Sequence, residues 1–157
     1  MSVPTRWVAL SALALSVGLF AGAVRADDAA VIDNRQAVMK SQGKDMTAIK
    51  AYVDDKADLA SAQAAGADLV TQVAKIPTLF PKGTGMAEYA GKSWAKPVVW
   101  TDADKFSAQA KTASEKAEAL DKALKGGDKA AITAAFGDMG KNGCGGCHEP
   151  FREKKPT

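Results

Sequence analysis

Histidine and cysteine are scarce in this sequence, which contains one histidine, His148, and two cysteines, Cys144 and Cys147. A closed structural zinc site needs four ligands of this kind, so these three residues cannot complete one. The sequence also shows no catalytic dyad and no second metal motif. We therefore predict that the protein is not an enzyme.

Runs of β-branched residues are lacking as well, whereas alanine is abundant after residue 26. This composition, together with helical spacing of the apolar residues, predicts an all-α fold. Aromatic residues make up 6% of the chain, and no basic stripe is interleaved with them. We therefore expect no nucleic-acid partner.

Cys144-Gly-Gly-Cys147-His148 is the motif in which these scarce residues meet. Its spacing is that of c-type haem attachment, in which each thiol adds to one vinyl group of the porphyrin and the histidine lies under the iron. We expect one covalent haem c. A thioredoxin-like redox pair would follow a strand, and no strand pattern lies nearby. A structural disulfide here would close too short a loop to stabilise the chain much.

Residues 1–26 have the features of an export signal. Arg6 precedes an apolar run of about 17 residues, and Val24-Arg25-Ala26 fits a cleavage site. Bacterial c-type haems are attached outside the cytoplasm, so both features predict a periplasmic protein with a single domain at residues 27–157. The apolar run is at the lower limit for a spanning helix, and an uncleaved membrane anchor is the alternative.

Four segments of the mature chain have helical periodicity, at about 28–53, 56–76, 101–127 and from 128 into the haem motif. Pro77 ends the second segment, and Gly126-Gly127 ends the third. The inward stripe of the first segment consists of Val31, Arg35, Val38, Met39, Gln42, Met46, Ile49 and Val53.

An antiparallel four-helix bundle, with the haem near the C-terminus, is the architecture that four such helices favour. The stretch between Pro77 and Trp100 has no helical pattern and contains several glycines and prolines. A long structureless loop is uncommon in a compact domain. We therefore expect Trp94, Pro97 and Trp100 to pack against one end of the bundle.

Several stretches of the mature chain match a known family. They are Arg35-Gln36-Ala-Val-Met39-Lys40, Leu79-Phe80-Pro81-Lys-Gly-Thr, Ala95-Lys-Pro97-Val-Val-Trp100, Ala135-Phe136-Gly137 and Cys144-Gly-Gly-Cys147-His148-Glu-Pro-Phe151-Arg152. In them the chain resembles class II c-type cytochromes, the family of cytochrome c′ and its low-spin relatives of the cytochrome c-556 type. Pro150 departs from the family pattern, and we expect it to kink or shorten the last helical turn.

The resemblance implies roles for seven residues. Cys144 and Cys147 would form the thioethers, His148 would be the proximal iron ligand, and Met39 would lie over the opposite face of the haem. Arg35 and Gln36 match positions that contact a haem propionate in relatives. Arg152 matches a position beside the proximal histidine. The resemblance also implies a homodimer formed through the first two helices.

The sixth iron ligand decides between two functions. Met139 lies nine residues before His148 on the same helix, about 13 Å along its axis, and cannot reach the far face. Met86 lies in the loop, and Met46 is two turns beyond Met39. Ligation by Met39 predicts a one-electron carrier serving periplasmic redox partners. If Met39 is only a flexible core filler, the alternative is a five-coordinate, high-spin cytochrome c′ that binds NO or CO.

Overall fold

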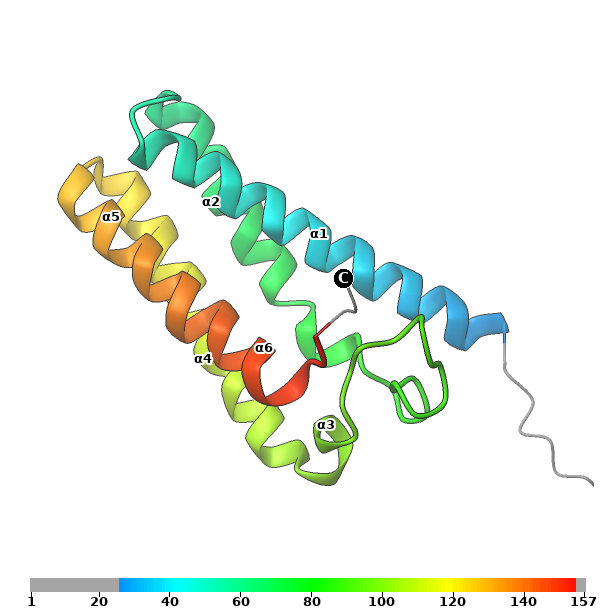
Figure 1. The fold of residues 1–157 in the computed structure, drawn as a ribbon. Coiled ribbons are helices and arrows are strands. Elements are labelled where there is room, and N and C mark those ends of the chain that lie inside the picture. The colour runs from blue at the N-terminus through cyan, green and yellow to red at the C-terminus, as the bar shows by residue number, and fades with distance from the viewer. Residues whose placement is uncertain (1–25, 155–157) are drawn as a thin grey trace, which may run out of the picture.

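The computed structural model describes residues 26–154. Its elements are α1 (Ala26–Val53), α2 (Leu59–Val73), the 3-10 turn η1 (Ile76–Thr78), α3 (Val98–Thr101), α4 (Ala103–Gly126), α5 (Lys129–Asp138), the π-helix η2 (Met139–Gly145) and α6 (Gly146–Phe151). Within the described residues there is no strand, only one isolated bridge between Ala95 and Arg152. α1, α2, α4 and the C-terminal helical run form an antiparallel four-helix bundle (Figure 1). The predicted fold class is confirmed.

The predicted signal peptide, residues 1–26, lies outside the described residues apart from Ala26, at which α1 begins. Among residues 26–154, no helix combines the length and the apolar character that a membrane crossing requires. The predicted domain boundary after residue 26 stays a prediction.

The helix ends follow from local side-chain chemistry. α2 begins later than predicted because Asp58 caps it, accepting a hydrogen bond from the backbone N–H of Ser61 at 2.7 Å. α4 ends where predicted, since Gly127 adopts a left-handed conformation with φ of 75°. Asp128 then caps α5 by accepting from the N–H of Ala130 at 3.1 Å.

The core of the bundle is aliphatic and rich in alanine. Gly66 lets α2 lie close to α4, because a Cβ at this position would be 2.5 Å from Cδ1 of Leu124. On α1 the predicted stripe is right except at its start, where Ile32 rather than Val31 is buried. The fully buried aliphatic side chains include Ile49, Leu69, Val73, Leu120, Leu124 and Ile132.

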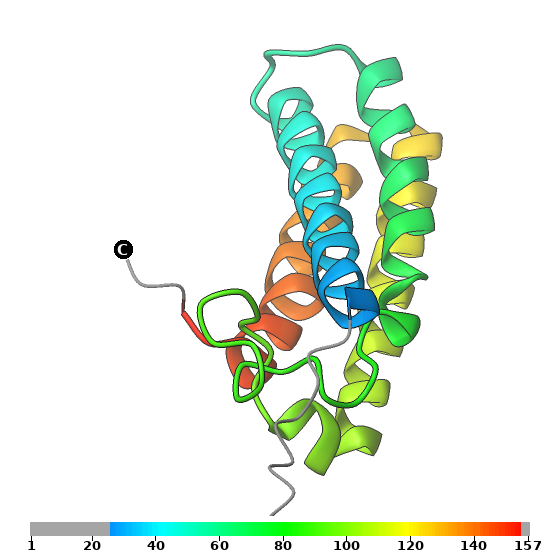
Figure 2. The same ribbon diagram turned by 90° about the vertical axis from the view of Figure 1, so that its right-hand side faces the viewer.

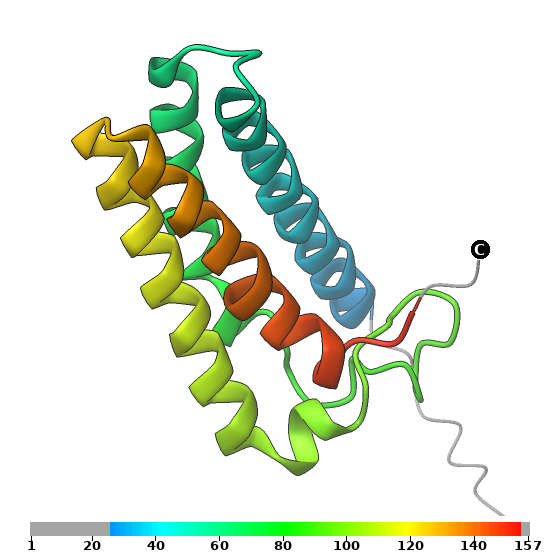
Figure 3. The same ribbon diagram turned by 60° about the vertical axis from the view of Figure 1, so that its left-hand side comes forward.

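The C-terminal rod, residues 129–151, runs alongside α4 as one continuous helical element made of α5, η2 and α6 (Figure 3). Its π-helical middle was not predicted from the sequence. Pro150 lies inside α6, which ends one residue later, and Arg152 is extended with φ of −119° and ψ of 131°. The expected shortening of the last turn is therefore confirmed.

The long connection between α2 and α3 folds over the end of the bundle where α1 begins and the C-terminal rod ends (Figure 2). Trp100 anchors it, donating a hydrogen bond from its indole Nε1 to the carbonyl oxygen of Phe80 at 2.9 Å. Phe80 in turn contacts Phe106 edge to face, with ring centroids 4.9 Å apart. The expectation was wrong for Pro97, which is exposed and directly precedes the short helix α3.

Candidate functional site

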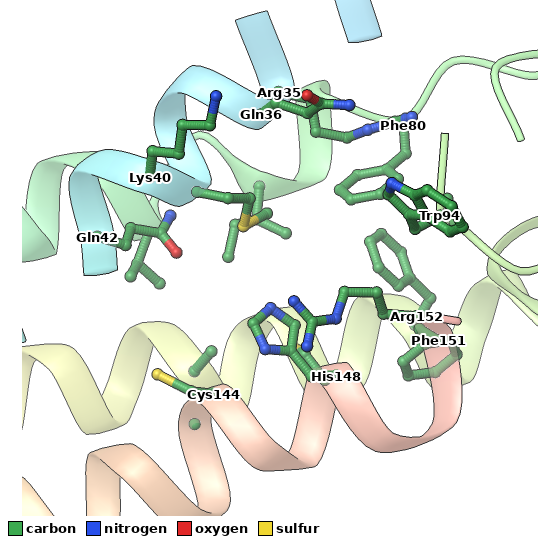
Figure 4. Close-up of a pocket in the computed structure, with 18 of the residues that line it drawn as sticks. Arg35, Gln36, Lys40, Gln42, Phe80, Trp94, Cys144, His148, Phe151 and Arg152 are labelled. Carbon is green, nitrogen blue, oxygen red and sulfur yellow. The ribbon is translucent and has the colours of Figure 1, made fainter. Parts of the chain in front are cut away.

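A cavity of about 350 Å³ lies at this end of the bundle, bounded by α1, the end of α2, the loop, α4 and the C-terminal rod. Figure 4 shows its side chains, with those of α1 facing those of the rod. All seven residues singled out from the sequence line this one cavity: Arg35, Gln36, Met39, Cys144, Cys147, His148 and Arg152. The structure thus brings together groups that lie more than 100 positions apart in the chain.

The π-helix η2 sets the direction of the haem motif. Hydrogen bonds from residue i to i+5 widen its turns, so Met139 and Cys144, five residues apart, both line the cavity. From Gly146 onward the rod returns to α-helical hydrogen bonding. Cys147 and His148 follow Cys144 by three and four residues and therefore project to the same side.

Two glycines allow the rod to pack closely on its neighbours. A Cβ at Gly143 would lie 2.7 Å from the sulfur of Met139, and a Cβ at Gly146 would clash with the amide of Gln109 on α4. Gln109 also donates a hydrogen bond from Nε2 to the carbonyl oxygen of Asn142 at 2.8 Å. α4 thereby holds the segment that presents the cysteines.

Both thiols are half-buried and free. Burial raises the pKa of Cys144, and burial followed by the proximity of Cys144 raises the pKa of Cys147 to about 11. Thioredoxin-like cysteines have lowered pKa values, so this environment does not favour that chemistry. Residues 26–154 also contain no cluster of three or more His, Cys, Asp and Glu side chains that could hold a metal ion.

His148 lies on the cavity wall with the guanidinium of Arg152 beside its ring (Figure 4). Burial, and to a lesser extent the charge of Arg152, lowers the pKa of His148 below its ordinary value. The imidazole is therefore neutral at pH 7, which is the form that ligates metals. Arg152 itself is exposed and occupies the position beside the histidine that the sequence predicted.

The wall opposite the C-terminal rod carries apolar side chains beside the polar ones of α1. Met39 from α1, Val73 and Ile76 from the region where α2 ends, and Phe80 from the loop all line it. Met39 is half-buried and packs against the main hydrophobic core of the bundle. Met46 packs against the same core but does not line the cavity.

Arg35 is a buried cation, 5% exposed, whose hydrogen bonds go to neutral groups of the loop. Its Nη1 donates to the carbonyl oxygen of Leu79 and the hydroxyl of Thr84, and its Nη2 donates to the carbonyl oxygen of Thr84 and the hydroxyl of Ser93. The guanidinium also lies over the ring of Phe80, 4.6 Å from its centroid. Burial lowers the pKa of Arg35. Arg35 therefore ties the loop to α1, whatever else it contacts.

Gln36 occupies the rim of the cavity and donates from Nε2 to the carbonyl oxygen of Lys92 at 2.6 Å. Like Arg35, it donates a side-chain hydrogen bond to the loop. The hydroxyl partners of Arg35, Thr84 and Ser93, are almost completely buried and were not identified from the sequence. The only signal for Thr84 was its place in the Leu79–Thr84 stretch. Gln42 was placed on the inward stripe but given no role, although it lines the cavity.

These residues fit a covalently attached haem. Two free thiols and a neutral imidazole face one cavity, which is otherwise lined largely by apolar and aromatic side chains that suit a porphyrin. The cations Arg35, Lys40 and Arg152 on the same lining suit its carboxylates.

The family model described as Cytochrome C′ matches residues 30–152. The chain is 36% identical to the cytochrome c′ of Pararhodospirillum photometricum over 126 residues, which cover 79% of this chain and 97% of the relative. It is 33% identical to the cytochrome c-556 of Agrobacterium fabrum over 141 residues, 87% of this chain and 89% of the relative.

Solved structures agree with this match. The crystal structure of cytochrome c′ from Rubrivivax gelatinosus is similar with a TM-score of 0.70 and 32% identity, covering 80% of this chain and 97% of that one. A nitric oxide complex of a mutant cytochrome c prime from Alcaligenes xylosoxidans has a TM-score of 0.73 and 27% identity, with coverage of 83% and 99%. A further cytochrome c′ with ligand-controlled dimer dissociation has a TM-score of 0.73 and 26% identity, with coverage of 81% and 97%.

Proposed function

This chain belongs to the cytochrome c′ family, and from that premise we propose that it binds a diatomic gas, NO or CO, at a five-coordinate haem iron. The family carries one covalent haem c, as the sequence predicted. When bound, the haem would supply an iron centre able to take a small diatomic ligand.

The haem would be held by three residues of the C-terminal rod. Cys144 and Cys147 would form the thioether bonds, and the neutral imidazole of His148 would face the iron from the same rod. Arg152, whose charge already acts on His148, would help to keep that imidazole neutral. Arg35 and Gln36 would hold the loop over the cavity from the other side.

The observation that carries the proposal is the match to relatives named cytochrome c′, and the position of Met39 agrees with it. Its side chain packs against the hydrophobic core of the bundle while lining the cavity, as a flexible filler does. The chain has no second histidine to serve as a distal ligand. The relatives named cytochrome c′, and the nitric oxide complex among the similar structures, support this function over the His/Met-ligated carrier preferred from the sequence.

The one-electron carrier is the second candidate. It is favoured by the cavity itself, since Met39 and His148 line it from opposite walls, and by the relatives named cytochrome c-556. With Met39 and His148 both as ligands, the iron would keep no open position for a gas, and its reduction potential would be higher. The partners would then be periplasmic redox proteins.

The remaining parts of the proposal concern location and assembly. The predicted export signal at residues 1–26 supports a periplasmic location, with membrane attachment only if that segment is retained. A homodimer is supported by the similar cytochrome c′ whose dimer dissociates under ligand control. The proposal assigns the protein no catalysed reaction.

Titration of the ferrous holoprotein with CO tests the proposal, using Met39→Leu, which keeps the volume but removes the sulfur, and Met39→Ala. Wild type and Met39→Leu should both bind CO with affinities within a few-fold of each other. Met39→Ala should bind roughly tenfold more tightly, a change of about 1.4 kcal/mol, because a ligand no longer displaces a packed side chain. Absorption in the Soret region reports the binding.

Met46→Leu is the matched control, because Met46 lies on the same helix as Met39 and packs against the same core but does not line the cavity. It should leave CO affinity unchanged. A wild-type protein that resists CO, together with a Met39→Leu variant that binds it, would reject the gas-binding function and establish the electron carrier instead.

A further inference from the structure

We propose that Gln42 lies on the gas-binding side of the cavity, and that its side-chain amide donates a hydrogen bond to the ligand bound there. This inference rests on the proposed function. It concerns a specificity-determining residue of that same site. Neither the spacing of the haem motif nor the roles implied for the seven predicted residues include it.

Gln42 is placed for this role by the geometry of α1. It follows Met39 by three residues, so both side chains lie on one helix face, and both line the cavity. Figure 4 shows the side chain of Gln42 extending from α1, with its amide oxygen on the side of the C-terminal rod that carries Cys144 and its nitrogen turned away from the rod. Val73 and Ile76, which also line the cavity, are apolar and offer a bound ligand no hydrogen bond.

The amide nitrogen of Gln42 has no partner in the protein. Nε2 is completely buried, yet it makes no hydrogen bond among the described residues. Buried donors are almost always satisfied, and leaving one unpaired costs free energy. The other glutamine of the cavity shows the contrast, since Nε2 of Gln36 donates to the carbonyl oxygen of Lys92.

Asp45, on the same helix, is the other group that the amide nitrogen of Gln42 could serve. It lies three residues beyond Gln42, and its Oδ2 is also buried without a partner. The two side chains do not bond to each other in this structure. A half-turn of the amide exchanges its NH₂ and carbonyl groups, and this terminal torsion is soft. The NH₂ group can therefore face a ligand in the cavity without movement of α1.

The C–O stretching frequency of the ferrous CO complex tests this role, because a donor near the ligand oxygen weakens the C–O bond. Gln42→Leu should shift the stretch to higher wavenumber and speed CO dissociation roughly fivefold, the effect of losing one hydrogen bond between neutral groups. Gln63→Leu is the matched control, since the side-chain amide of Gln63 donates a hydrogen bond to the carbonyl oxygen of Leu124 outside the cavity. It should leave both quantities unchanged.

Two outcomes would overturn the inference. One is an unchanged stretch and dissociation rate in Gln42→Leu. The other is an equal shift in Asp45→Ala, which would mean that the effect comes from the Gln42–Asp45 pair rather than from contact with the ligand. If the wild-type protein does not bind CO, the proposed function fails separately. Gln42→Leu is then compared within the Met39→Ala variant, where the ligand position is open, with the same stretch as the readout.

Discussion

Replacing Cys144 and Cys147 together by alanine should yield a protein from which acid–acetone extraction removes all of the haem. Both thiols are free and line the cavity from the C-terminal rod, and the family's haem is covalently attached. Without either sulfur no thioether can form. The measurement is a haem stain of the denatured protein, which should fall from one haem per chain to none.

His148→Ala is the companion variant. It keeps both thiols, so it should retain covalent haem, but its spectrum should change because the proximal nitrogen is lost. Covalent haem that persisted in the double cysteine variant would contradict the assignment of the motif. An unchanged spectrum of His148→Ala would contradict the assignment of the proximal ligand.

Loss of the haem should also lower stability severely. The cavity has a volume of about 350 Å³, and an empty apolar cavity costs about 24 cal/mol per Å³, which gives an upper limit of about 8 kcal/mol. Water entering from the open side reduces that cost. The free energy of unfolding of a domain is only about 5–15 kcal/mol, so even part of this cost is decisive.

Thermal unfolding followed by circular dichroism measures the difference between holoprotein and apoprotein. The holoprotein should show mostly helix, and the apoprotein should melt more than about 20 °C lower. The double cysteine variant, freed of haem, serves as the apoprotein, because its two substitutions remove no core aliphatic side chain. Melting temperatures within a few degrees of each other would show that the haem is not part of the core.

The parts of the fold that depend on local chemistry were predictable. The end of the third helical segment at Gly126-Gly127 and the start of the fourth at residue 128 are read from spacing and residue type alone, and the structure confirms both. Nothing in the spacing of residues 139–145 marked the π-helix η2, and the close approach of Gly146 to Gln109 on α4 is visible only in the structure.

The candidate site was predictable to a different degree on its two sides. The spacing of Cys144, Cys147 and His148 is that of covalent haem attachment, so these residues were identified from the sequence alone. The opposite side is built from a long-range network, in which Arg35 reaches Thr84 and Ser93. Nothing local marks those hydroxyls as its partners. Gln42 was found on the inward stripe, but only the structure shows that its amide lacks a partner.

The absorption spectrum of the ferrous wild-type protein at neutral pH tests the central claim most directly. An open iron position beside a packed Met39 predicts a high-spin spectrum with a single broad band in the visible region, which changes at once when CO is added. A sharp low-spin α-band that is indifferent to CO would contradict the claim and identify Met39 as the sixth ligand of an electron carrier.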